Sequence, residues 1–172
     1  MKSKYYKLLL AVSVPGLVVA LVTAGLLFSS GDALPEKKSA PDFSLQLLDG
    51  GKFQLGDYNG KPIMINFFAS WCHPCRIESP ALVTVRGEYE PKGITFLAIA
   101  IDDTEEDVKK FIEELDFIFP VGLDKTGEIK DAFGVYGLPT TYFINRDGTI
   151  NYTHPGSATK DLLRHELDKL LL

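Results

Sequence analysis

The sequence predicts an α/β fold, in which a mixed central β-sheet is covered by helices on both faces and one transmembrane helix precedes the domain. Three observations support this. Strand-like and helix-like segments alternate from residue 40 onward, as in layered α/β domains. The only two cysteines, Cys72 and Cys75, stand where a buried strand gives way to a helix. An uncharged run of 21 residues, 8–28, lies near the N-terminus.

The uncharged run is long enough to cross a membrane, since a helix of that length extends about 30 Å. Lys2, Lys4 and Lys7 precede it, which places that end in the cytoplasm by the positive-inside rule. We therefore expect a single-pass protein of a bacterial cell membrane whose parts are a cytoplasmic N-terminus at 1–7, an anchor at 8–28, a linker at 29–39 and an extracytoplasmic domain at 40–172. Small residues at 29–33 leave cleavage as a signal peptide open.

The first half of the domain opens with an N-terminal hairpin extension, because strand-like segments at 43–47 and 52–55 flank the turn signal Asp49-Gly50-Gly51. The apolar run 63–68 predicts a buried strand, which leads into the two cysteines and a helix at 76–90. Pro80 lies inside that helix and should kink it.

The second half continues the alternation. The unbroken apolar run 94–101 predicts a central strand, and Thr104 with Asp107 resembles a capping box that opens a helix reaching Leu115. The same patterns predict five further elements: a short strand near Val121, a small helix at 129–133, strands at 141–145 and 149–153, and an amphipathic helix at 159–171. The last two strands flank Arg146-Asp147-Gly148 and form a second hairpin.

The charge and the cysteine count narrow the function classes. A net charge of −5 and a pI near 5.2 argue against nucleic-acid binding, which requires a basic face. Two cysteines are half of a structural zinc site, and the three histidines show no ligand spacing, so we expect no metal. His154, expected in a loop before Pro155, and His165, on the polar side of the last helix, receive no role.

A Cys-x-x-Cys pair between a strand and a helix is most often a redox dithiol. Unpaired backbone N–H groups and the helix dipole favour a thiolate at Cys72. A thiolate attacks disulfides, and Cys75 lies close enough to resolve the mixed disulfide that forms. We therefore expect catalysis by the redox-active disulfide Cys72–Cys75, with no other cofactor.

Several motifs together resemble the thioredoxin fold. Trp71-Cys72-x-Pro74-Cys75 matches its active-site pattern, Pro80 takes the place of its helix-kinking proline, and Gly137-Leu138-Pro139-Thr140 looks like the loop whose proline is cis and faces the dithiol. The opening Ala40-Pro41-Asp42-Phe43 and the early hairpin resemble the membrane-anchored ResA- or TlpA-like reductants of the AhpC/TSA-redoxin superfamily. The resemblance covers residues 40–172.

This resemblance assigns a proton-handling role to Glu78. The buried acid of cytosolic thioredoxins, six residues before the first cysteine, is replaced here by Asn66, whereas the ResA-like subgroup has a glutamate where Glu78 stands. Glu78 follows Cys75 by one helical turn, so its carboxylate would raise the thiol pKa values and accept a proton. The alternative is that Glu78 only complements the helix N-terminus from solvent.

Five further residues complete the predicted site. His73 departs from the subgroup pattern, and its protonated form would lower the pKa of Cys72, whereas a solvated side chain would do nothing. Trp71 and Pro74 are expected to contact substrate, with core packing as the alternative for Trp71. Pro139 is expected to frame the substrate cleft together with Trp71, and its neighbour Leu138 to pair its backbone with an extended substrate segment.

The resemblance implies a thiol–disulfide oxidoreductase that reduces disulfides in exported proteins such as apocytochrome c, and that is re-reduced by a membrane electron donor. Three alternatives remain. His73 favours an oxidase or isomerase of exported proteins. The Pro41-Asp42-Phe43 opening suggests a thiol peroxidase, although Ala69 stands where a peroxidatic site needs threonine. A zinc-binding module would need ligands that the sequence lacks.

Overall fold

The computed structural model describes residues 38–172, and the predicted parts at 1–7 and 8–28 lie outside this range, as does 29–37 of the predicted linker. Lys38 and Ser39, which the sequence assigned to the linker, already belong to the domain. Ser39 forms a β-bridge with Thr149, and the N–H of Ile150 donates to the carbonyl of Lys38 at 2.8 Å. Among residues 38–172, no helix is both long and apolar enough to span a membrane.

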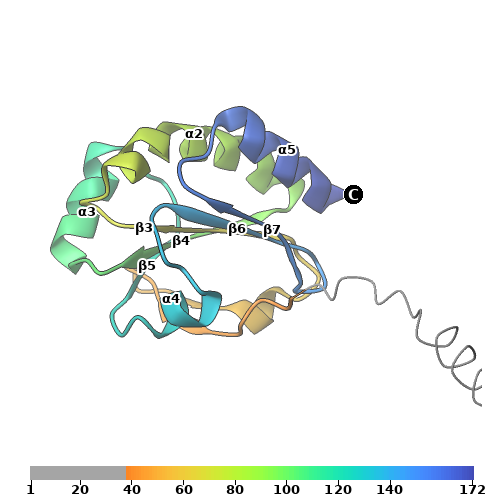
Figure 1. Ribbon diagram of the computed structural model, residues 1–172, viewed down its shortest axis with the longest axis horizontal. Coiled ribbons are helices and arrows are strands. Elements are labelled where there is room, and N and C mark those ends of the chain that lie inside the picture. The colour runs from red at the N-terminus through yellow and green to blue at the C-terminus, as the bar shows by residue number, and fades with distance from the viewer. Residues whose placement is uncertain (1–37) are drawn as a thin grey trace, which may run out of the picture. The chain divides into compact units, whose positions relative to one another are not determined.

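Strands and helices alternate along the chain as predicted, and Figure 1 shows them as layers. Residues 38–172 contain seven strands, which are β1 (Ser44–Gln46), β2 (Lys52–Gln54), β3 (Ile63–Phe68), β4 (Thr95–Ile101), β5 (Val121–Asp124), β6 (Thr140–Ile144) and β7 (Ile150–Pro155). The α-helices are α2 (His73–Tyr89), α3 (Glu105–Glu114), α4 (Glu128–Phe133) and α5 (Lys160–Leu171). Two short 3₁₀ helices, η1 (Leu55–Tyr58) and η2 (Glu90–Lys92), complete the described elements.

The central sheet is mixed, with the strand order β5-β4-β3-β6-β7. β3 runs parallel to β4 and antiparallel to β6, and β7 closes one edge antiparallel to β6. β1 and β2 pair antiparallel in a separate two-stranded sheet, which reaches the β5 edge through a bridge between Leu47 and Gly122. The mixed sheet with helices on both faces confirms the α/β part of the predicted fold class, whereas the predicted transmembrane helix lies outside the described residues.

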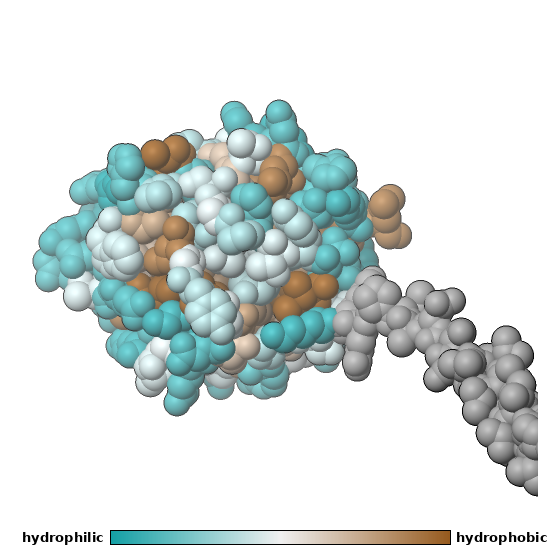
Figure 2. Space-filling view, viewed as in Figure 1, coloured by the Kyte–Doolittle hydropathy of each residue, from teal (hydrophilic) through white to brown (hydrophobic). Residues whose placement is uncertain are grey.

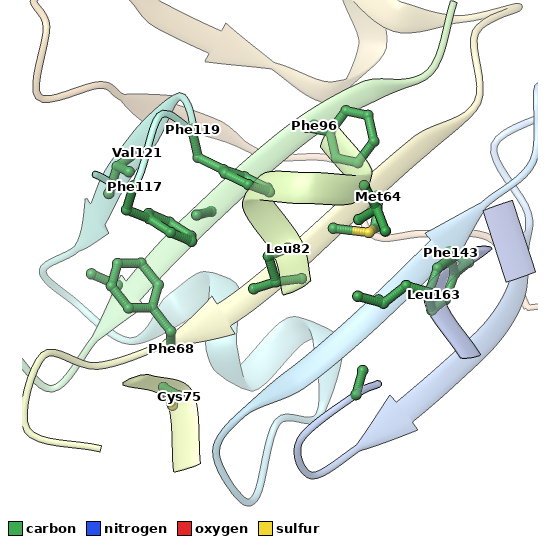
Figure 3. Close-up of a cluster of buried hydrophobic side chains, with 14 of the residues drawn as sticks. Met64, Phe68, Cys75, Leu82, Phe96, Phe117, Phe119, Val121, Phe143 and Leu163 are labelled. Atoms are coloured by element: carbon green, nitrogen blue, oxygen red, sulfur yellow. The ribbon is translucent and has the colours of Figure 1, made fainter. Parts of the chain in front are cut away.

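The side chains of β3 alternate between two apolar cores. All six of its residues are buried, as expected for the middle strand of a sheet covered on both faces. Met64 and Phe68 point into the core beneath α2, α3 and α5, which Figure 3 draws. Ile65 and Phe67 belong to the core shared with α4 and the β1–β2 hairpin. Asn66 lies between Met64 and Phe68 on the α2 side, so a polar residue stands in the wall of an apolar core.

The starts of α3 and α5 follow their sequence signals, whereas the start of α2 does not. The Thr104 hydroxyl accepts from the N–H of Asp107 at 3.2 Å and donates to its carboxylate at 2.8 Å, which confirms the predicted cap of α3. Thr159 caps α5, since its hydroxyl accepts the N–H of Leu162 at 3.3 Å. α2 begins at His73, three residues earlier than predicted, and continues through Pro80 to Tyr89. The dithiol is therefore part of the first turn of α2.

Candidate active site

The two cysteines form a disulfide at the start of α2, directly beyond the end of β3. Cys72 is the N-cap residue, and its sulfur accepts the N–H of Cys75 at 3.2 Å. Pro74 in the first helical turn favours this start, because its ring fixes a helical φ and it has no N–H to satisfy. The disulfide is thus held at the end of the helix where unpaired N–H groups favour negative charge on sulfur.

A hollow of about 340 Å³ lies beside the disulfide. Cys72 lines it and Cys75 does not, and Cys75 is only 1 % exposed. The further lining residues that matter here are Trp71, Pro74, Tyr136 and Leu138. Of the two cysteines, Cys72 is therefore the one in the wall of the hollow, and it is itself only 4 % exposed.

The Trp71 side chain is 64 % exposed, so it stands on the surface instead of packing in the core. Its indole N–H donates to the backbone carbonyl of Asp102 at 2.9 Å, which fixes the ring over the hollow. The Asp102 carboxylate in turn pairs with Lys130 at 3.0 Å. Tyr136 is fully exposed next to the same hollow. Two aromatic side chains thus border the hollow beside Cys72. On the face of the molecule that Figure 2 draws, hydrophobic residues form only small, separate patches.

The loop before β6 approaches the dithiol from the sheet. The Leu138–Pro139 peptide bond is cis, as predicted. Thr140, the first residue of β6, pairs with Phe67 near the C-terminal end of β3. The chain continues from this end of β3 to Cys72, so the loop before β6 lies at the same end of the sheet as the dithiol. The carbonyl of Pro139 accepts the N–H of Gly156 at 2.8 Å, and Leu138 stays half-buried in the wall of the hollow.

Glu78 is 2 % exposed and lies on the buried face of α2 together with Cys75. Its carboxylate accepts the side-chain N–H of Asn66 at 3.0 Å and the backbone N–H of Ala158 at 2.9 Å. Burial raises the pKa of Glu78 to about 7, while the hydrogen bonds from Ala158 and Asn66 lower it by less. The alternative that Glu78 only complements the helix from solvent is therefore wrong, and a proton acceptor that titrates near neutral pH lies one turn from Cys75.

The histidines take different places. His73 is exposed at the start of α2, and no hydrogen bond or ion pair is found for it among residues 38–172. His154 was expected in a loop but belongs to β7, because antiparallel pairing with Thr141 extends that strand to Pro155. Its ring nitrogens lie 3.4 Å from the Tyr152 hydroxyl and from the Ser157 carbonyl. Within 38–172, no three His, Cys, Asp or Glu side chains are grouped to hold a metal ion.

Sequence reasoning missed four residues at the site: Asp102, Tyr136, Ser157 and Ala158. Ala158 donates to Glu78 from a position 80 residues away, and Ser157 donates its hydroxyl to the carbonyl of Pro74 at 3.1 Å. Asp102 holds Trp71 through a backbone carbonyl, which carries no residue signal. Tyr136, by contrast, directly precedes the Gly137–Thr140 loop, so its position next to a predicted site loop was a usable signal.

Comparison with known proteins agrees with this geometry. The model of the AhpC/TSA family matches residues 37–153, which include both cysteines, Glu78 and the cis-proline loop. The chain belongs to the AhpC/TSA family. A ResA thiol-disulfide oxidoreductase of Oceanobacillus iheyensis is 37 % identical over 98 % of this chain and 87 % of its own length. The thioredoxin-like protein YneN of Bacillus subtilis is 38 % identical over 78 % of this chain and 80 % of its own.

Solved structures place the fold in the same group. A thiol:disulfide interchange protein of the thioredoxin family from Chlorobium tepidum has a TM-score of 0.74 and 31 % identity, and the match covers 81 % of this chain and all of that one. A secreted Mycobacterium tuberculosis disulfide oxidoreductase, described as homologous to E. coli DsbE, has a TM-score of 0.68 and 26 % identity over 74 % of this chain and 96 % of its own. This member of the AhpC/TSA family is a thiol–disulfide oxidoreductase with a thioredoxin-like fold.

Proposed function

We propose that this chain is a membrane-tethered, extracytoplasmic reductase of disulfides in exported proteins. The observation that best supports electron flow from this protein to its substrate is the burial of Glu78 on the same helix face as Cys75. A carboxylate there disfavours a neighbouring thiolate. Strong oxidants stabilise their reduced, thiolate form, so a site that disfavours the thiolate gives up electrons more readily.

The reaction would proceed in two exchanges. The Cys72 thiolate attacks one sulfur of the substrate disulfide, so that a mixed disulfide forms and the other substrate sulfur leaves as a thiolate, which takes up a proton. Cys75 then loses its proton to the Glu78 carboxylate and attacks the sulfur of Cys72. The Cys72–Cys75 disulfide forms, the second substrate sulfur is released and protonated, and two electrons have passed to the substrate.

The hollow beside Cys72 supports a polypeptide substrate. Trp71 and Tyr136 offer aromatic surface, and the backbone of Leu138 would pair with an extended segment next to the substrate cysteine. Apocytochrome c, whose Cys-x-x-Cys-His segment must be reduced before haem is attached, is the substrate that we propose from the resemblance to ResA-like reductants. A membrane protein that delivers electrons would return the disulfide to the dithiol.

The tether is proposed from the sequence. The lysines before residues 8–28 and the absence of charge within that run support an anchor with its N-terminus in the cytoplasm. The domain would then work where disulfides persist, and so where a reductant of exported proteins is required.

Two measurements in cells test the proposal. Replacing Cys75 by Ser should trap Cys72 in mixed disulfides with exported proteins, because the resolving thiol is missing, and Cys72→Ser is the matched control that should trap none. Alkylation of wild-type cells should find the Cys72–Cys75 pair mostly as the dithiol in the membrane fraction. A pair that is mostly oxidised would indicate an oxidase or isomerase, and a chain recovered in the cytosolic fraction would overturn the extracytoplasmic location.

A further inference from the structure

The side chain of Asn66 joins two buried partners on the α2 side of the sheet. Its Nδ2 group donates to Glu78 Oε1 and to Thr141 Oγ1, both at 3.0 Å. Asn66 and Thr141 are direct neighbours in the β3–β6 register, and both are 0 % exposed. The three side chains form a polar chain closed off from solvent, at the end of the sheet that carries the dithiol.

The same amide has one atom without a partner. Asn66 Oδ1 is buried and accepts no hydrogen bond. An unsatisfied buried acceptor is unfavourable, so this orientation of the amide must be maintained by what Nδ2 binds. A carboxylate explains it, because an ionised carboxylate only accepts hydrogen bonds and a bond to a charged acceptor is about twice as strong as a neutral one.

A proton on Glu78 reverses this requirement. The carboxylic acid has an O–H that needs an acceptor, and Nδ2 cannot provide one. Half a turn of the Asn66 amide would bring Oδ1 to the place of Nδ2, where it can accept that O–H. The Thr141 hydroxyl suits both orientations, because it accepts from Nδ2 in one and donates to Oδ1 in the other.

We propose that Asn66 is a positioning residue for proton transfer at Glu78, and that its amide turns over when Glu78 changes between carboxylate and carboxylic acid. The inference rests on the proposed function, in which Glu78 takes the proton of Cys75. Asn66 then holds the proton acceptor in place before the transfer and holds the protonated acid after it. Glu78 thus has a suitable partner in both states without access to water.

Other titratable groups near Glu78 do not supply this partner. Within residues 38–172, no hydrogen bond or ion pair joins Glu78 to any other titratable residue of the helices and of the strand β7. On α2, β7 and α5 these residues are Cys72, His73, Cys75, Arg76, Arg86, Glu88, Tyr89, Tyr152, His154, Lys160, Asp161, Arg164, His165, Glu166, Asp168 and Lys169. β3 has no titratable residue, and the one on β6, Tyr142, lies in the core on the opposite face. The side-chain hydrogen bond found for Glu78 within residues 38–172 is the one from Asn66.

Nuclear magnetic resonance of the full-length, oxidised chain with ¹⁵N-labelled asparagine tests the turnover directly. Above the Glu78 midpoint, the Asn66 amide protons should show contacts with the methyl group of Thr141, and below it these contacts should be lost. Glu78→Gln is the matched control, because its amide cannot titrate and the contacts should stay independent of pH. Contacts in the wild-type chain that persist unchanged from pH 5 to pH 9 would overturn the turnover.

Infrared titration of the same oxidised chain tests the positioning role. The carboxylic-acid band of Glu78 is identified by its loss in Glu78→Gln. In Asn66→Leu the midpoint of this band should lie about one pH unit higher than in wild type. The reason is that the substitution removes a charge-assisted hydrogen bond from the carboxylate but only a neutral one from the acid. Ser79→Ala is the control, since that buried hydroxyl donates to the Cys75 carbonyl instead. An unmoved midpoint would refute the role of Asn66. Neither readout depends on the substrate or on the direction of electron flow, so the proposed function can fail separately.

Discussion

The buried Glu78 carboxyl predicts a pH-dependent stability that its amide counterpart lacks. In Glu78→Gln the side chain keeps its size but cannot ionise. Its NH₂ group can donate to the side-chain oxygen of Asn66, and its carbonyl oxygen can accept the N–H of Ala158. The wild-type chain must hold a carboxylate in the same apolar surroundings whenever the pH exceeds about 7, the raised pKa of Glu78.

The size of the effect follows from linkage. The folded pKa of about 7 lies above the ordinary value of 4.5, so folding favours the protonated form. The stability contributed by this group is fully present below about pH 4.5 and is lost as the pH rises through about 7. At 1.36 kcal/mol per pKa unit, the whole loss is about 3 kcal/mol. The free energy of unfolding of wild type relative to Glu78→Gln should therefore fall by about 3 kcal/mol between pH 4 and pH 8.

Urea denaturation of the oxidised protein at a series of pH values measures this difference. Glu113→Gln is the matched control, because it removes the same charge from an exposed position on α3 and should give a difference that varies little with pH. A difference between wild type and Glu78→Gln that is constant from pH 4 to pH 8, or that grows with pH in favour of wild type, would refute the reasoning.

Three further substitutions test the packing that positions the site. Phe68→Ala should lower the free energy of unfolding by about 3–5 kcal/mol in urea denaturation, because this fully buried ring contacts the core under α2; a loss below about 1 kcal/mol would contradict that packing. Thr104→Ala should cost about 1 kcal/mol through the lost cap of α3, and Thr104→Ser should restore most of it. Gly122→Ala should increase hydrogen exchange in β1, since the new Cβ would lie 2.5 Å from Leu45; unchanged exchange would show that the hairpin shifts without loss.

The sequence predicted the strands and helices closely where the signal is local. The largely apolar run of β3, the cap at Thr104 and the two glycine turns each depend on residues within a few positions. The start of α2 was placed too late because a cysteine sulfur at the N-cap is not among the usual capping signals. β7 was ended too early because Pro155 suggests a loop, yet a proline is tolerated at the end of an edge strand.

The site was predictable in its residues but not in its contacts. The motif spacing brought Cys72, Cys75 and Glu78 onto one helix, and the resemblance added the cis-proline loop. No local signal indicated that Glu78 would be bonded by Ala158, because that contact depends on how α5 packs against α2. The exposure of Trp71 likewise depended on the loop after β4, which holds the indole outward.

The reduction potential of the Cys72–Cys75 disulfide at pH 7 tests the central claim most directly. Equilibration of the full-length chain against dithiothreitol or glutathione buffers measures it, with Glu78→Gln as the comparison. The account predicts a potential near or below about −270 mV, as in thioredoxin, and a less reducing value in Glu78→Gln. A wild-type potential near about −120 mV, typical of a strong oxidant, would contradict a reductase whose direction is set by Glu78.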